Sequence, residues 1–379
     1  IELSGNFLSY VYMYCSYQEF IVPFSPWFDK MSRPHEPHRP SFPFGNPFRL
    51  MRPKGSFLNS KLLALLNAFE ETLAERLRKL KLNVGCDTNL SLSWMHLAIE
   101  TLCDIHKDIM NFITELELPV CDWEDKWIDF YLDDSVKILD ICIAFSSELS
   151  RLSQGHVLLQ CALHGLDSAS SRQACSSFDG WRQHINSKNQ KLDNCDTILD
   201  DLIKSVNLPK VKNSAKGKVL LRAMYGVKVS SMFICAVCCA IFSGSGKNLK
   251  DFQALGHFLW AETFTDVQRS VNTVIRNLCS RGSGRILKEL EAVDVSAKKL
   301  NSMAHNECPA EAEAIEKPLL DLRKDAEKLS QGLDVLVTKV DDFFQIVLSG
   351  RDALLCNLRD GEGGSDLFEE RNRGRQARR

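Results

Sequence analysis

The chain has 379 residues, of which 44% are apolar and 25% are charged, and its formal net charge is −2. This balance supplies enough apolar side chains for a sizeable core without disulfide or metal staples. A net charge near zero gives no overall attraction to nucleic acid or to anionic lipid, so we expect no nucleic-acid partner and only local electrostatic targeting. The 14 cysteines lie mostly among apolar residues, a pattern typical of buried side chains in an intracellular, reducing compartment.

The first 56 residues differ in composition from the rest of the chain. Residues 1–30 are apolar but lack the basic start and the cleavage site of a secretory signal, and the composition changes abruptly at Met31. We therefore expect residues 1–30 to be an extension upstream of the natural start, with an N-terminal membrane anchor as the alternative. Residues 31–56 hold six prolines and predict an extended basic arm, whose phenylalanines offer contacts to a partner or to the chain's own domain: Phe42, Phe44 and Phe48.

From residue 57 to residue 359 the apolar residues recur with a helical period, and no stretch alternates convincingly with the period of a strand. The fold class that follows is all-α: an elongated multi-helix bundle with a long heptad-patterned C-terminal helix. The earlier helices are expected at 60–80, 92–118, 122–152, 155–166, 179–206, 217–243, 249–280 and 284–304. The helix at 122–152 carries apolar residues on two faces, which predicts that it lies between other helices.

Two groups of polar residues in the first half of the helical domain resemble catalytic or metal sites only weakly. The carboxylates between residues 124 and 134 repeat as the solvated stripe of a helix would, and we do not interpret them as a catalytic pair. His156, Cys161 and His164 form a loose cluster without the spacing of a structural zinc site, so ordinary packing is the favoured interpretation.

The most apolar run of the helical domain ends at Gly246. Residues 229–246 are 18 uncharged residues and would span about 27 Å as a helix, against a hydrocarbon core of about 30 Å. The candidate membrane residues are Val227, Val229, Met232, Phe233, Ile234, Val237, Ile241 and Phe242. A basic flank without acidic residues accompanies them and is typical of the cytoplasmic side of a span or of contact with anionic lipid: Lys210, Lys212, Lys216, Lys218, Arg222 and Lys228.

Three interpretations of this run stay open: a single marginal span, peripheral lipid contact, or a buried core helix. Its chemical motifs are incomplete. Residues 244–247 read G-S-G-K, but a phosphate loop requires glycine where Ile241 stands and serine or threonine where Asn248 stands. The C-x-x-C spacing of Cys235, Cys238 and Cys239 lies inside an apolar helix without a second pair, so we interpret these thiols as packing residues. The sequence thus predicts no catalytic residue, no metal and no cofactor, and an enzyme is not expected.

The last long helix has the most regular pattern. Between residues 319 and 347, apolar residues recur at spacings of three and four through four heptads, so this face packs against another helix. Two interpretations stay open: an intramolecular contact of the bundle, or a seam that binds a partner protein. The candidate partner seam comprises Leu322, Leu329, Leu333, Leu336, Val340 and Phe343. Beyond Arg359 glycine and arginine dominate, and residues 360–379 are expected to form a disordered tail.

Several segments resemble the plant BYPASS family. They are FPFGNPFR at 42–49, FEETLAERL at 69–77, ELPVCDWEDKWIDFYLDDSVKILDICIAFSSELSRLSQGHVLLQ at 117–160, HFLWAETFTDVQ at 257–268 and ALLCNLR at 353–359. The resemblance covers residues 31–359, and residues 1–30 and the arginine-containing tail lie outside it.

The resemblance implies a helical plant protein without known catalytic residues. BYPASS proteins restrain a mobile, carotenoid-related signal from root to shoot and so permit normal root and shoot development. A related branch binds the exocyst tethering complex, which implies an adaptor with protein partners of that kind and no known small-molecule ligand. The alternative function is an enzyme or carrier that acts on the signal precursor in an apolar pocket of the bundle.

The resemblance also bears on location. Members of the family are often assigned one membrane span where this chain has residues 227–246, and some have been considered plastid proteins. We therefore expect an intracellular, membrane-associated protein that faces the cytoplasm, with the cytosol or the plastid as the alternative location.

Overall fold

A computed structural model describes residues 59–82, 90–117, 127–168, 170–205, 214–253, 256–280, 286–305 and 312–376. The interpretations of residues 1–30 and of the arm at 31–56 lie outside these ranges. Residues 61–379 belong to one compact unit, which is the part considered below. Within the described ranges the regular structure is helical, and the one β-type contact is an isolated bridge between Leu90 and Leu287. The all-α class is therefore confirmed.

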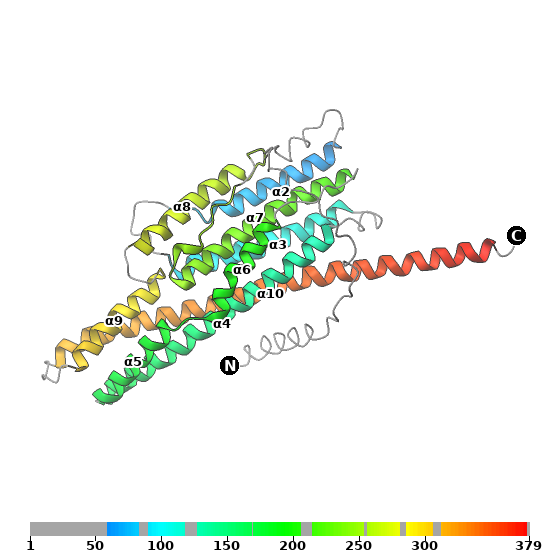
Figure 1. The fold of residues 1–379 in the computed structure, drawn as a ribbon. Coiled ribbons are helices and arrows are strands. Elements are labelled where there is room, and N and C mark those ends of the chain that lie inside the picture. Colours follow the sequence, from blue (N-terminus) through cyan, green and yellow to red (C-terminus); the bar gives the residue numbers. More distant parts are fainter. Residues whose placement is uncertain are drawn as a thin grey trace, which may run out of the picture. The chain divides into compact units, whose positions relative to one another are not determined.

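Figure 1 shows the described helices in chain order. They are α2 (Ser60–Arg78), α3 (Leu92–Leu116), α4 (Trp127–Asp167), α5 (Ser171–Asn186), α6 (Gln190–Lys204), α7 (Ala215–Ser243), the 3-10 turn η3 (Gly246–Asn248), α8 (Ala261–Ser280), α9 (Lys288–His305) and α10 (Ala312–Gln376).

Helix α4 is one continuous helix of 41 residues, where the sequence predicts separate helices at 122–152 and 155–166. Gly155 lies inside it and provides room for α5. A Cβ atom at this position would lie 2.9 Å from Ile185 Cδ1 and 3.1 Å from Trp181 Cζ3. The glycine therefore serves close helix packing and does not end the helix. Helix α4 contacts α5, α6, α7 and α10, which confirms that it lies between other helices.

Helices α5 and α6 are separate, where the sequence predicts one helix at 179–206. The chain is extended at Ser187, and the side chain of Asn189 caps α6 by accepting a hydrogen bond from the Lys191 backbone N–H at 3.0 Å. The Asn189 amide also donates to Glu148 Oε2 on α4 at 3.0 Å. This turn lets both α5 and α6 pack against α4.

Two further helices differ from the predicted bounds. Helix α8 begins at Ala261, and not at residue 249. Helix α10 begins at Ala312, with Pro318 inside its first turns, and its backbone stays helical to Gln376. It therefore extends over residues for which the sequence predicts a disordered tail. The prediction of disorder rests on the small number of apolar residues in this segment. A helix can still form there, because its backbone hydrogen bonds lie within the helix itself. Side chains are described only as far as Cys356.

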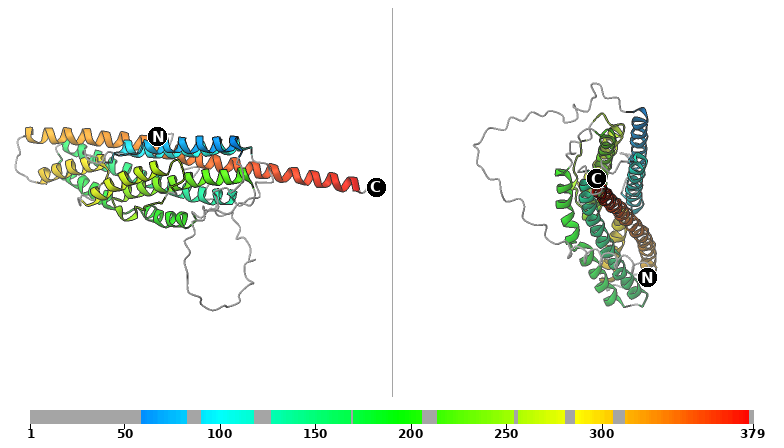
Figure 2. Two further views of the ribbon diagram at one scale, coloured as in Figure 1. Left: turned by 90° about the horizontal axis from the view of Figure 1, so that it is seen from above. Right: turned by 90° about the vertical axis from the view of Figure 1, so that its right-hand side faces the viewer.

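The core forms where α7 and α10 meet the other helices. Helix α7 contacts α3, α4, α6 and α8, and α10 runs along α3, α4 and α9 (Figure 2). All six candidate seam residues of α10, from Leu322 to Phe343, are at most 1% exposed. The interpretation of this seam as a surface open to a partner is therefore corrected. A heptad pattern is the same for a contact within a chain and for one between chains, and here the contact is internal.

Candidate functional site

Helix α7 carries the candidate membrane residues. Within the described residues it is the one helix long and apolar enough to cross a membrane, and 83% of its most apolar window is buried inside the protein. Seven of the eight candidate membrane residues are buried, and Phe242 is half-buried. A core helix of a soluble protein has the same length and composition, so burial by its neighbours supports the core interpretation.

Part of the predicted basic flank lies in internal ion pairs. Arg222 Nη2 donates to Glu70 Oε2 at 3.0 Å, and the same oxygen accepts the Leu259 backbone N–H at 2.8 Å. Glu70 is fully buried, and the Arg222 guanidinium also lies 4.9 Å from the centre of the Phe258 ring. Arg222 thus neutralises a core carboxylate, and a lipid headgroup would have to compete with that partner.

Lys228 makes the second internal pair. Its ammonium lies 2.7 Å from Asp134 Oδ2 on α4 and donates to the Ser205 carbonyl at 3.0 Å, with 10% and 16% of the two charged side chains exposed. Burial lowers the pKa of Lys228 and raises the pKa of Asp134, and each shift is opposed by the partner's charge. The pair joins α4, α6 and α7.

The other members of the flank do not form one patch with these two. Lys216 donates to the Glu117 carbonyl at 2.8 Å, and Lys218 is exposed. Lys210 and Lys212 lie outside the described residues. Peripheral lipid contact through the basic flank, one of the interpretations that the sequence leaves open, does not fit Arg222 and Lys228, because both face partners within the bundle.

A small cavity lies between α3, α4, α6 and α7, beside the Lys228 pair. Its volume is about 40 Å³, and His106, Tyr131 and Ser231 are among its lining residues. His106 Nε2 lies 3.1 Å from Ser231 Oγ, and burial lowers the pKa of His106 to about 4. Such a volume holds about three water molecules and is far below the roughly 300–1,000 Å³ of typical ligand pockets.

The predicted cysteine and histidine clusters are not brought together into a site. Cys235, Cys238 and Cys239 are buried in α7, and burial raises the pKa of the Cys238 thiol to about 12. Cys161 and His164 are exposed on α4, and His156 is half-buried on the same helix. No group of three or more histidine, cysteine or carboxylate side chains in the described ranges has the geometry to hold a metal ion.

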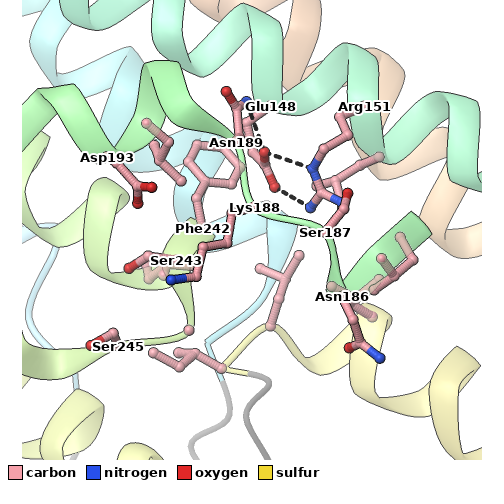
Figure 3. A pocket seen from close by; sticks show the side chains of 18 of the residues that line it. Glu148, Arg151, Asn186, Ser187, Lys188, Asn189, Asp193, Phe242, Ser243 and Ser245 are labelled. Atoms are coloured by element: carbon pink, nitrogen blue, oxygen red, sulfur yellow. Dashed lines mark hydrogen bonds and ion pairs between the residues drawn. The ribbon is translucent and has the colours of Figure 1, made fainter. Parts of the chain in front are cut away.

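A cleft of about 690 Å³, which sequence reasoning missed, lies between several helices (Figure 3). Its walls come from the middle of α4, from the turn between α5 and α6, from the C-terminal end of α7 with the residues that follow, and from α9. Its local signals in the sequence are the Asn-containing turn at 186–189 and the G-S-G-K stretch, which is an incomplete phosphate loop.

A satisfied ion pair lies at the base of this cleft. Arg151 Nε donates to Glu148 Oε2 at 2.9 Å (Figure 3). Arg151 Nη1 donates to the His184 carbonyl at 2.7 Å. Asn189 donates a further bond to Glu148. The carboxylate and the guanidinium neutralise each other, so the pair supplies no free catalytic group. Its hydrogen bonds to His184 and Asn189 hold the turn between α5 and α6 in place.

The rim of the cleft is polar and carries free charges. Lys188, on the turn, and Lys247, in η3, are exposed, and neither ammonium has a hydrogen bond or ion pair with another described residue. In Figure 3 the side chain of Lys188 extends toward Ser243 across the cleft. Asp193 is exposed at the start of α6, whereas Lys298 is paired with Asp294 at 2.7 Å.

The packed interior and the open polar cleft define a helical-bundle protein whose accessible site lies at its surface. The sequence model of the BPS1 family, described as "Protein BPS1", matches residues 99–340. The chain belongs to this family, which confirms the resemblance found in the sequence.

Relatives in plants support the assignment. The chain is 51% identical over 334 residues to "Protein BPS1, chloroplastic" of Arabidopsis thaliana, covering 87% of this chain and 93% of the relative. It is 36% identical to "UPF0496 protein 4" of Oryza sativa, in both the japonica and the indica subspecies, covering 89% of this chain and 99% of each relative. No solved structure matches the chain significantly.

Proposed function

We propose that the chain is a non-enzymatic regulatory adaptor of plant cells, which restrains a root-derived mobile signal and permits normal root and shoot development, as the BYPASS resemblance implies. The observation that carries this proposal is the size of the interior cavity beside α7. At about 40 Å³ it is too small for a carotenoid-related molecule. The alternative, an enzyme or carrier with the signal precursor inside the bundle, would need a larger interior space than this cavity offers.

The adaptor would bind protein partners through outward helix faces, because the heptad seam is core. Two large apolar residues of α10 are exposed: Leu320 is 66% exposed and Val335 is 52% exposed. Amphipathic helix faces of this kind are common docking elements. By family resemblance, the partners include components of the exocyst type.

Proximity labelling in root cells tests the adaptor proposal. The wild-type chain should label a reproducible set of proteins, and Val335→Asp should remove part of that set without lowering the amount of folded protein. Thr197→Asp, at an exposed position of α6, is the matched control and should label the wild-type set. An unchanged set in Val335→Asp would contradict binding through this face, and consumption of a metabolite from root extract by the purified chain would favour the enzyme alternative.

We propose that any membrane association is peripheral and intracellular. The burial of α7 supports this proposal, because a span would have to leave α3, α4, α6 and α8. The name of the Arabidopsis relative, which includes "chloroplastic", supports the plastid as the alternative location. Carbonate extraction of membranes is the test: the chain should be released into the supernatant, and retention in the pellet would contradict a peripheral association.

A further inference from the structure

Two unpaired lysines face the cleft from different walls. Lys188 comes from the turn between α5 and α6, and Lys247 follows the end of α7. The other lysine of the cleft, Lys298, and the arginine at its base, Arg151, are paired with carboxylates. Lys188 and Lys247 are therefore the two ammonium groups with all their hydrogen-bonding capacity free for a ligand, among the described lining residues.

A hydroxyl donor lies beside these lysines. Ser245 Oγ accepts the Lys247 backbone N–H at 3.3 Å, so its own proton remains free to donate. The C-terminal end of α7, which carries the negative end of the helix dipole, also lies here. Two of its carbonyls already accept hydrogen bonds: the Gly244 N–H donates to Ile241 at 3.3 Å, and the Ser245 N–H donates to Ala240 at 3.1 Å. Gly244, with φ of 65°, permits this left-handed cap.

We propose that this cleft binds a small phosphate ester that carries hydroxyl groups. A dianionic phosphate suits two ammonium groups on different walls together with the Ser245 hydroxyl, because lysine binds phosphate as a compact point charge. Asp193, exposed on the α6 wall, is placed to accept hydrogen bonds from hydroxyls of the same ligand. The volume of about 690 Å³ lies within the range of small-molecule sites.

The mixed charge of the rim favours a soluble phosphate ester over a phosphorylated lipid in a bilayer. Asp193 lines the cleft close to the turn that carries Lys188. A carboxylate at the rim opposes contact with an extended anionic membrane surface, whereas a single phosphate group needs to contact only the two lysines. The site differs from the outward faces of α10 proposed to bind protein partners, so either proposal can fail without the other.

Isothermal titration calorimetry on the full chain, with glucose 6-phosphate and inorganic phosphate as probes, tests the proposal. At least one of the two phosphate probes should bind saturably, and glucose should not. Lys188→Gln and Lys247→Gln should each weaken that binding by about tenfold, as expected for loss of one charge-assisted hydrogen bond. Lys218→Gln, which removes an exposed lysine near the other end of α7, is the matched control and should leave the affinity unchanged.

The variants are expected to fold, because both lysines are exposed and unpaired, and an unchanged unfolding midpoint checks this point. Absence of saturable binding of both phosphate probes would overturn the proposal, and so would equal affinity in the wild type and in both glutamine variants. A third arm uses vesicles that contain phosphatidylinositol 4-phosphate. Binding to these vesicles without binding of either soluble probe would overturn the assignment to a soluble ligand.

Discussion

Charged side chains in the core of this protein depend on partners distant in sequence. Glu70 is paired with Arg222, 152 residues away, and Lys228 with Asp134, 94 residues away. Removing one partner would leave a buried charge, which costs about 3–5 kcal/mol. The basic flank looked like a membrane signal in the sequence because a local window contains Arg222 and Lys228 without their carboxylates. Only the tertiary structure brings these carboxylates to them.

His106 predicts a loss of stability in acid. Burial lowers its pKa to about 4, below the ordinary value of 6.5. Between these two values the unfolded chain binds a proton that the folded chain does not, so the contribution is fully present above pH 6.5 and is lost as the pH falls toward 4. The loss amounts to about 3 kcal/mol. Urea denaturation at pH 7 and pH 4.5 should show a smaller acid-induced loss for His106→Gln than for the wild type.

His96→Gln is the control for this experiment, since His96 is partly exposed on the same helix. This variant should retain the acid-induced loss of the wild type. If His106→Gln and His96→Gln lost the same free energy of unfolding between the two pH values, His106 would not be the buried neutral group described here.

Asp341 predicts the opposite pH dependence. Burial, with a smaller contribution from the neighbouring Asp342, raises the pKa of Asp341 from 3.8 to about 6. The folded chain therefore holds the proton more tightly than the unfolded chain, and stability decreases as the pH rises between these values. Asp341→Asn should increase the free energy of unfolding at pH 7.5 and lose this advantage near pH 3.5. Asp334→Asn, at an exposed position of α10, should change stability little at either pH.

At the scale of elements, the helical class and most helix positions could be predicted from periodicity, whereas the boundaries between consecutive helices could not. The sequence predicts a break between residues 152 and 155, but the helix is continuous there and Gly155 contacts Trp181 and Ile185. The predicted helix at 179–206 contains Asn189, but Asn189 caps α6 and binds Glu148. In both cases the decisive partner lies on another helix, about 30 to 40 residues away, which a local pattern does not contain.

Close packing of α4 on α5 predicts different effects for two glycines of this helix pair. A Cβ atom at Gly165 would lie 2.9 Å from the backbone nitrogen of Ala174, whereas the nearest neighbour of a Cβ atom at Gly180 is Leu158 Cδ2 at 4.0 Å. Gly165→Ala should therefore cost about 1–3 kcal/mol by overpacking. Gly180→Ala should be neutral or should stabilise the helix by up to about 1 kcal/mol. Thermal unfolding distinguishes them, and equal effects would show that the helices do not approach closely at Gly165.

The buried heptad seam predicts opposite outcomes for two neighbouring residues of α10. Leu336 is fully buried and Val335 is 52% exposed. Leu336→Asp places an unpaired charge in the core and should lower the free energy of unfolding by about 4 kcal/mol or more. Val335→Asp should change it by less than about 1 kcal/mol. A folded, stable Leu336→Asp protein in urea denaturation would restore the interpretation of the seam as an external docking surface.

At the scale of the whole molecule, the described helices bury a large apolar core, and a polar cleft of about 690 Å³ opens at the surface. Composition and the family resemblance were sufficient to predict a helical protein of this kind. The cleft could not be predicted, because Glu148, Lys188 and Lys247 come from separate segments and meet only through the turn between α5 and α6 and the cap of α7. The G-S-G-K stretch gave a local hint, because Ser245 and Lys247 line one wall of the cleft, but it is not a phosphate loop.

The central claim is that α7 is the buried core helix of a folded bundle in water. Hydrogen–deuterium exchange of the full chain in detergent-free buffer tests it most directly, because the slowest amides report the elements that open only on global unfolding. The backbone amides of α7 between Val227 and Ile241 should be among the slowest to exchange, together with those of the buried α10 seam. Fast exchange throughout α7 in otherwise folded protein, or protection that appears only when lipid is added, would contradict the account.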